Sequence, residues 1–270
     1  MARNVIDRDL AVAVLDEQFD AVLGLCDELG PTDWDVATAC PGWSVKDNVV
    51  HIIGTEAMLL GRPTPEVELP DDLPHVRNDI GRFNEQWITA YRATPPGQVV
   101  ADLAETIAAR RAELAGMDQT AFDAESFTPA GPDTYGRFMR IRVMDMWMHE
   151  QDIREVVGRP GHDGGAAPEF ALDEMTGALG FVVGKRAGAP AGTSVRFELT
   201  GPAARRVDVE VGERARVVEA VDGSPTVTLA MPALLFTRLC GGRGADPAGV
   251  EVTGDGDLGA AVVANMGFMI

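Results

Sequence analysis

The sequence has no long apolar run. Its 270 residues are 46% hydrophobic and 24% charged, and no stretch approaches the roughly 20 apolar residues that a membrane-spanning helix needs. The first eighteen residues place acidic side chains among the apolar ones, unlike the uninterrupted hydrophobic stretch of a secretion signal. We therefore expect a cytoplasmic protein without a membrane partner.

Cysteine and basic residues are also scarce. The three cysteines, Cys26, Cys40 and Cys240, are widely separated and form no CxxC pair, which argues against a disulfide framework or a cysteine-rich zinc site. Against 23 Lys and Arg stand 42 Asp and Glu, a formal net charge of -19. Because nucleic-acid binding requires clustered positive charge, we expect no nucleic acid partner.

The first part of the chain has the pattern of long helices joined by polar loops. Apolar residues recur at three- and four-residue steps, and glycine and proline interrupt the pattern between segments. Ser44 opens one of these segments, with Asp47 as an acidic partner in its first turn. The pattern predicts helices at about 5–29, 44–61, 78–92, 98–116 and 135–157, and so a helical bundle over residues 1–160.

After residue 160 the pattern changes to short alternating segments with glycine-rich joints. These predict antiparallel strands at about 193–201, 205–212, 214–221 and 225–231. A helix at 169–186 precedes them, and a helix at 232–242, a strand at 250–254 and a helix at 257–269 follow. The predicted fold class is therefore α+β with two domains: a four-helix bundle over 1–160 and a smaller α+β domain over 161–270.

The segment "RVMDMWMHEQDIR", residues 142–154, places polar groups on one side of an apolar helix. Positions four apart lie one above the other, so Asp145 and His149 share a face, and Asp152 stays close to it. The helix predicted from Ser44 carries His51 among Val and Ile residues. If the two helices face each other, His51, Asp145 and His149 form the ligand set of a catalytic zinc with one open position.

Spacing alone leaves a second interpretation open. A histidine within an apolar helix is commonly a hydrogen-bonded core residue, and an acid four residues before a histidine occurs often by chance. The polar triad then forms a buried hydrogen-bond network. Cys40, before Pro41 and Gly42, is expected to pack a turn, since no base lies near it in sequence.

The stretches "ATACPGWSVKDNVVHIIGTE" and "MDMWMHEQDIREVVGRP" resemble the metal-binding helices of the mycothiol-dependent maleylpyruvate isomerase family, a branch of the DinB-like bundles. The segments around "LLFTRLCGGRGA" and "VEVTGDGDLGAAVVANM" are similar to that family's sterol-carrier-like C-terminal domain. The resemblance implies that His51, Asp145 and His149 bind a divalent metal, with Zn²⁺ expected, and that mycothiol is the thiol cosubstrate.

In the resembled family the metal-bound thiolate adds to a small electrophile, which leads either to cis–trans isomerisation of a maleylpyruvate-type acid or to S-transfer. This chain departs from the pattern at Asp145, where relatives with isomerase chemistry carry Glu, and Asp is shorter by about 1.5 Å of reach. Asp152 is then expected as a substitute ligand or as the partner that sets a histidine tautomer near the bound cofactor.

Two arginines complete the predicted site. Arg238 and Arg243, on either side of "LCGG", are candidates for catalysis and, at Arg243, for binding an anionic substrate or the thiol, because arginine matches carboxylates. Solvated surface arginines are the alternative.

The expected enzyme is an isomerase or S-transferase, a monomer or homodimer, whose partners are a small electrophile and a low-molecular-weight thiol. The alternative is a non-catalytic binding protein for a small molecule or lipid; a redox-regulatory partner is disfavoured, since no cysteine neighbours His51 or His149.

Overall fold

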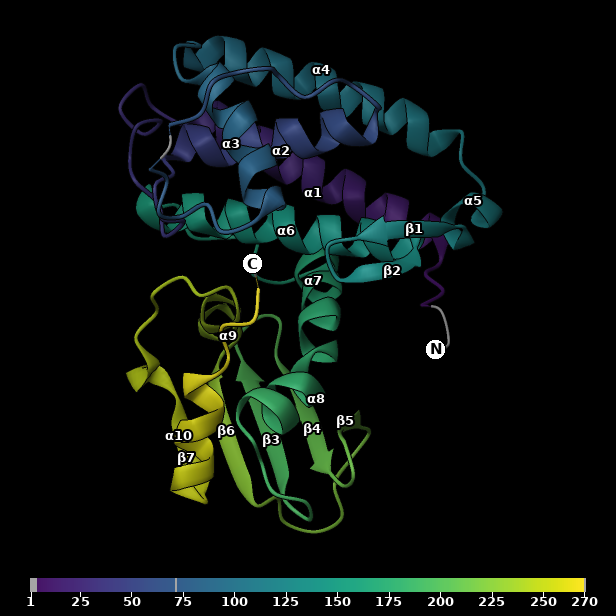
Figure 1. The fold of residues 1–270 in the computed structure, drawn as a ribbon, viewed down its shortest axis with the longest axis vertical. Helices are drawn as coiled ribbons and strands as arrows, with labels where there is room; N and C mark the ends of the chain where they lie inside the picture. Colours follow the sequence, from purple (N-terminus) through teal and green to yellow (C-terminus); the bar gives the residue numbers. More distant parts are fainter. Residues whose placement is uncertain (1–3, 71, 270) are drawn as a thin grey trace. The chain divides into compact units, whose positions relative to one another are not determined.

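The computed structural model describes residues 4–70 and 72–269 (Figure 1). The chain divides into two compact units, Met1–Gly161 and His162–Ile270. The first unit is helical apart from one small hairpin, and the second combines helices with a five-stranded sheet. The predicted fold class, a helical region followed by an α+β region, is confirmed.

Four long helices, α1, α2, α4 and α6, and the shorter α3 and α5 build the described part of the first unit. α1 packs against α4 and α6, and α2 packs against α3, α4 and α6 (Figure 1). The bounds of these elements, in chain order, are α1 Arg8–Glu28, α2 Val45–Leu59, α3 Asp79–Tyr91, α4 Pro96–Ala115, α5 Gln119–Asp123, β1 Glu125–Thr128, β2 Gly131–Thr134 and α6 Tyr135–Val156.

Side-chain caps begin the helices that carry the site. Ser44 and Asp47 form a complete capping box at the start of α2, as the sequence predicts, and Thr134 accepts a hydrogen bond from the Arg137 backbone at the start of α6. Such caps satisfy backbone N–H groups that have no partner within the helix. α1 begins later than predicted, so Val5 lies before it and is 69% exposed.

A buried ionic network joins three helices of the bundle. Glu56 of α2 accepts hydrogen bonds from Arg110 Nε of α4 at 2.8 Å and from Arg142 Nε of α6 at 2.9 Å. Arg142 also contacts Asp145 one turn further along α6. All but Asp145 are almost completely buried. Because unpaired buried charges are costly, the network ties α2, α4 and α6 together in a defined register.

Residues 117–134 were expected to form a loop, and this expectation is wrong. They contain α5 and the antiparallel hairpin β1–β2, in which Glu125 pairs with Thr134 and Thr128 with Gly131. Gly131 has a positive φ of 100° at the turn, a conformation that glycine adopts at little cost. Asp133 accepts hydrogen bonds from Asn4 and Arg137, so the hairpin is fastened to the start of the chain and to α6.

The second unit is built on a mixed sheet with strand order β5-β4-β3-β6-β7. The expectation of a wholly antiparallel sheet is corrected at one pair, since β3 and β6 run parallel while the other neighbours are antiparallel. Its elements are α7 Ala166–Gly177, α8 Leu179–Phe181, a π-helical turn Val182–Arg186, β3 Ser194–Thr200, β4 Arg205–Val211, β5 Ala215–Val218, β6 Val227–Pro232, α9 Ala233–Cys240, a 3₁₀ turn Pro247–Gly249, β7 Glu251–Gly254 and α10 Gly256–Ala264.

Alternation along β3 explains how this sheet is covered. Val195, Phe197 and Leu199 are buried, whereas the intervening Glu198 is exposed. Helices α8, α9 and α10 pack against the sheet, and Phe197 meets Phe236 of α9 edge to face, with ring centroids 6.2 Å apart. Alternation with a period of two therefore places one side of β3 in the core of this unit.

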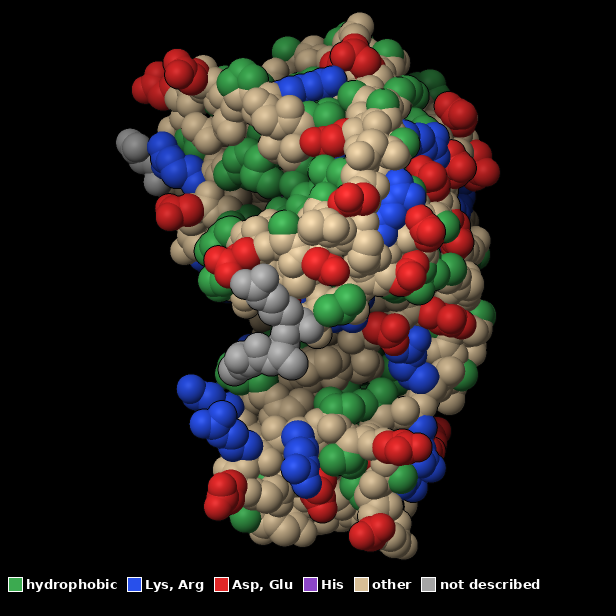
Figure 2. All heavy atoms as spheres, turned by 90° about the vertical axis from the view of Figure 1, so that its right-hand side faces the viewer, with side chains coloured by type: hydrophobic (Ala, Val, Ile, Leu, Met, Phe, Trp, Pro, Cys, Tyr) green, Lys and Arg blue, Asp and Glu red, His purple; other side chains and the backbone are tan. Residues whose placement is uncertain are grey.

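Acidic side chains are spread widely over the face drawn in Figure 2, with Lys and Arg among them. This distribution accords with a formal net charge of -19. Within residues 4–70 and 72–269, the structure contains no helix with the length and apolar character needed to span a bilayer.

Candidate metal centre

The loop before α2 is braced by its own hydrogen bonds. Thr38 N–H donates to the Trp43 carbonyl at 2.9 Å, and Trp43 N–H donates to the Cys40 carbonyl at 3.0 Å. Gly42, with a φ of 82°, lies against His75, whose ring would be 2.9 Å from an added Cβ. Only glycine allows the backbone to lie this close to the His75 ring. The loop therefore holds Trp43 and the start of α2 in one fixed arrangement.

The structure brings the three predicted ligands together. His51 Nε2 of α2 lies 2.9 Å from Asp145 Oδ2 of α6, and His149 Nε2 lies 3.6 Å from Asp145 Oδ1. The two imidazole centroids are 4.6 Å apart. One ligand atom from each residue lies within 4.8 Å of the others. The geometry suits a shared cation, and the role of these residues as metal ligands stays a prediction.

The Asp145 carboxylate is held in its charged form. Burial alone would raise the pKa of Asp145, but the neighbouring His51 and Arg142 charges hold that pKa well below its usual range. The Asp145 side chain keeps 30% of its exposure, whereas His51 and His149 keep 7% and 6%. The cluster is therefore reached from the side of Asp145, and its acid is ready to act as a ligand.

The donor set fits a divalent cation. Two imidazoles and one carboxylate are ligands of catalytic zinc sites that leave one position open. The other nitrogen of His51, Nδ1, is buried and has no hydrogen-bond partner within the described residues, so no hydrogen bond there fixes which nitrogen carries its proton. The Nε2 atoms of both rings lie on the Asp145 side, where the cation would be held.

An indole ring forms a wall beside both histidines. The Trp43 ring lies 5.3 Å from His51 and 5.6 Å from His149, between ring centroids. Its Nε1 donates to buried Glu85 at 2.8 Å, and His75 Nε2 lies 2.8 Å from the same carboxylate oxygen. His75 therefore packs on the loop and shares Glu85 with Trp43.

A second group of polar side chains surrounds the far nitrogen of His149. Nδ1 lies 2.7 Å from Asn48 Oδ1, 3.6 Å from Cys40 Sγ and 3.6 Å from Asp152 Oδ2. Cys40 Sγ donates to Asp152 Oδ2 at 3.1 Å. The expectation that no cysteine neighbours His149 is therefore wrong, since the fold brings Cys40 to its ring. Asp152 thus lies beside the histidine, as its spacing predicts. Asn48 was not predicted, although one sequence signal marks it: it is a polar residue one turn before His51, and so on the same side of the predicted helix.

The two predicted arginines belong to the second unit. Arg238 lies in the last turn of α9, and Arg243 follows that helix, where its Nη1 donates to the Gly241 carbonyl at 3.2 Å. Their assignment to catalysis or cofactor binding stays a prediction.

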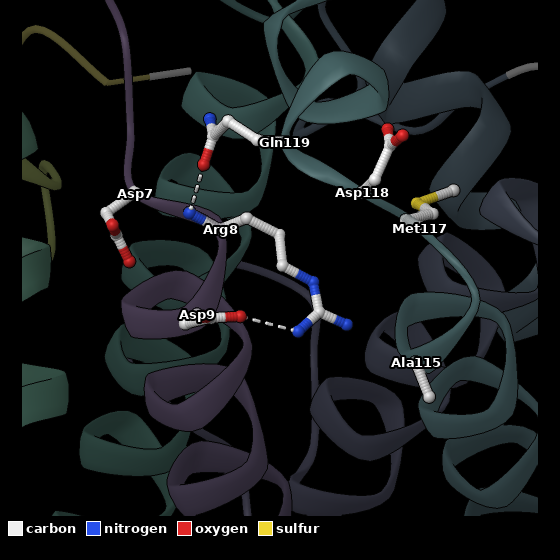
Figure 3. Close-up of a pocket in the computed structure, with 7 residues that line it drawn as sticks. All are labelled: Asp7, Arg8, Asp9, Ala115, Met117, Asp118 and Gln119. Carbon is white, nitrogen blue, oxygen red and sulfur yellow. Dashed lines mark hydrogen bonds and ion pairs between the residues drawn. The ribbon is translucent and has the colours of Figure 1, made fainter.

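A separate cavity of about 310 Å³ opens between the start of α1 and the end of α4 (Figure 3). Arg8 reaches along it and pairs with Asp9 at 2.8 Å, and its backbone N–H bonds to Gln119. The cavity contains none of the predicted ligands. Its lining residues are Asp7, Arg8, Asp9, Ala115, Met117, Asp118 and Gln119.

Solved structures share this fold. The mycothiol-dependent maleylpyruvate isomerase superimposes with a TM-score of 0.56 at 14% identity, and a histidine-to-alanine mutant of such an enzyme with 0.57 at 15%. Each alignment covers 92% of this chain and 93% of the solved one. At this identity the likeness establishes the fold.

Curated relatives add no assigned activity. Uncharacterized proteins from two strains of Mycobacterium tuberculosis are 23% identical over 148 residues, which is 54% of this chain. The chain matches 56% of the length of these relatives, so the alignment spans only about half of each protein.

Two domain families match the sequence. The mycothiol maleylpyruvate isomerase N-terminal domain matches residues 15–154, and the C-terminal domain of the same isomerase matches residues 169–261. The first match contains the whole His51, Asp145 and His149 cluster. The chain therefore belongs to the mycothiol maleylpyruvate isomerase family, in both its helical and its α+β part.

Proposed function

We propose that the helical unit is a divalent-metal centre, with zinc as the expected metal, that serves a thiol-dependent reaction on a small electrophile. The observation that carries the proposal is the convergence of His51, Asp145 and His149, whose ligand atoms lie within 4.8 Å of one another. Family membership supports it. When bound there, the cation would lower the pKa of a thiol such as mycothiol and so supply a thiolate at neutral pH.

The chain's own residues define what the site accepts. Trp43 closes one side with an apolar ring, while the partly exposed Asp145 marks the side from which small molecules enter. Arg142 balances the charge of Asp145 from within the bundle. The arrangement suits either isomerisation of a small unsaturated acid or S-transfer, because both begin with the same thiolate.

A thiol-dependent assay tests the proposal. The protein would be incubated with zinc, mycothiol and a panel of small electrophiles, and products would be followed by mass. A gain equal to the thiol indicates S-transfer, and altered geometry at unchanged mass indicates isomerisation. Turnover should disappear in His51→Ala and His149→Ala and persist in the control His162→Ala, which alters a histidine of the other unit. Turnover that survives both ligand replacements would contradict the proposal.

One observation favours a second function, non-catalytic binding of a small molecule or lipid. Asp145 already contacts His51 and Arg142, so its charge is paired without a cation. A ligand retained through purification, with affinity unchanged in His149→Ala, would support this function over catalysis.

A further inference from the structure

The hydrogen bonds of Asn48 fix the direction of its contact with Nδ1 of His149. Asn48 Nδ2 lies 2.8 Å from the Ser44 carbonyl and 2.9 Å from Thr38 Oγ1. A backbone carbonyl accepts and cannot donate, so the amide nitrogen of Asn48 must face it. The other end of the side chain, Oδ1, therefore faces His149 Nδ1 at 2.7 Å. Because Oδ1 only accepts, Nδ1 must carry the hydrogen.

Neighbouring groups agree with this direction. Thr38 Oγ1 accepts from Asn48 and from the Cys40 backbone and donates to the Trp43 carbonyl at 3.1 Å, so its own role is settled. If Nδ1 of His149 were instead bare and accepted from the Cys40 thiol at 3.6 Å, its lone pair would face the Asn48 oxygen at 2.7 Å. Two lone pairs at that distance repel each other, and this arrangement is disfavoured.

Asp152 is the other acceptor near Nδ1 of His149, and its geometry is poorer. Its Oδ2 lies 3.6 Å from Nδ1, beyond a normal N–H···O hydrogen bond, and the same oxygen accepts from Cys40 Sγ at 3.1 Å. Asn48 is 0% exposed and is anchored through both amide hydrogens. The residue that sets the tautomer is therefore Asn48, although Asp152 has the more obvious sequence spacing.

We propose that Asn48 is a positioning residue: it keeps the proton of the neutral His149 ring on Nδ1, so that the Nε2 lone pair faces Asp145 and His51 before any cation arrives. The proposal deepens the proposed function, since a bare Nε2 is what a metal ligand requires. No residue plays the same part for His51, because its Nδ1 lacks a hydrogen-bond partner within the described residues. The two histidines are thus preorganised to different degrees.

Nitrogen-15 spectra of the metal-free protein test the tautomer directly. Long-range proton–nitrogen correlations, recorded at the alkaline end of the His149 titration, distinguish Nδ1–H from Nε2–H. The wild-type protein should show Nδ1–H. Asn48→Leu, of similar size without an acceptor, should shift the ring toward Nε2–H or a mixture, while Asn48→Asp, which keeps an acceptor, and Asp152→Asn should retain Nδ1–H. Nε2–H in the wild-type protein would overturn the proposal, even if a variant fails to fold.

Metal affinity gives an independent readout. Chelator competition should show zinc binding about 10- to 100-fold weaker in Asn48→Leu, the usual effect of losing a group that supports a metal-binding histidine, with a smaller change in Asp152→Asn. An equal or larger loss in Asp152→Asn would contradict the role given to Asn48. If the wild-type protein binds no zinc, the proposed function fails, whereas the tautomer measurement still decides the role of Asn48.

Discussion

Nε2 of His51 lies 2.9 Å from Oδ2 of Asp145, across the contact between α2 and α6. The two residues are 94 positions apart in sequence, and the bundle brings them into direct contact. This pair, together with His149 one turn after Asp145, is the feature on which the metal centre depends.

Replacing Glu56 should destabilise the helical unit strongly. Glu56→Gln removes the charge that Arg110 and Arg142 share, and breaking a buried ion pair by losing one partner typically costs about 3–5 kcal/mol. Urea unfolding would measure the loss. Glu105→Gln is the matched control. Glu105 is 75% exposed and its contact with Arg62 is long, at 3.5 Å, and such surface ion pairs contribute about 1 kcal/mol or less to stability. Equal effects of the two changes would contradict the network's role.

The hairpin carboxylate Asp133 should make stability depend on pH in the acid range. Burial would raise the pKa of Asp133, but hydrogen bonds from Asn4, Thr134 and Arg137 lower it to about 2. Because the folded-state pKa lies below the unfolded value of about 3.9, the stabilisation is present above that value and is lost as the pH falls through about 2.

Asp133→Asn should therefore lower the free energy of unfolding near neutral pH by about 1 kcal/mol, after allowance for solvent screening. The gap to the wild-type protein should close as the pH falls from about 4 to about 2, which denaturant titrations at several pH values would show. Asp9→Asn is the control, since Asp9 is 88% exposed. A gap that stays constant with pH would contradict the assigned cause.

Cys26 and Cys240 should be unreactive in the folded protein. Burial raises the pKa of Cys26 to about 12 and raises that of Cys240 further above its usual range, and thiolate is the reactive form. A chromogenic disulfide reagent at mildly alkaline pH should label neither thiol until denaturant is added, after which all three cysteines of the chain should react. Rapid labelling of Cys26 or Cys240 in the native protein would contradict this prediction, because it would show that the core around that thiol opens readily.

The Glu85 carboxylate should support the metal centre indirectly. Glu85→Ala leaves Trp43 Nε1 and His75 Nε2 without their shared acceptor, and an unsatisfied buried donor costs about 1–3 kcal/mol. We expect lower stability and weaker zinc binding, because Trp43 no longer has a fixed position beside His51. His75→Ala should have a smaller effect on zinc binding, since Trp43 keeps Glu85. The reverse order would contradict this role for Trp43.

Local patterns in the sequence predict much of the fold. The caps and periodicity locate α1, α2, α3, α4 and α6 to within a few residues, since these signals act within one or two turns. The β1–β2 hairpin is missed because its strands have four residues each and β2 contains glycine and proline. The parallel pairing of β3 with β6 is missed for another reason. The alternation of apolar and polar residues indicates which face of a strand is buried, but it does not indicate which strands are neighbours or in which direction they run.

The site is predictable where its members share a helix. Asp145, His149 and Asp152 follow from positions three and four apart on α6. That His51 faces them required the family resemblance, because no spacing rule relates residues on separate helices. Asn48 contacts His149 from 101 positions away, and Trp43 contacts Glu85 from 42. Such contacts depend on tertiary packing and leave no periodic signal in the sequence.

Metal content tests the central claim most directly. The purified protein would be equilibrated with zinc, dialysed, and analysed for bound metal per chain, beside His51→Ala, His149→Ala and the control His162→Ala. The account predicts about one tightly bound zinc ion in the wild-type protein and in the control, and a large loss in each ligand variant. A wild-type protein that takes up no divalent metal at neutral pH, or ligand variants that retain it fully, would contradict the account.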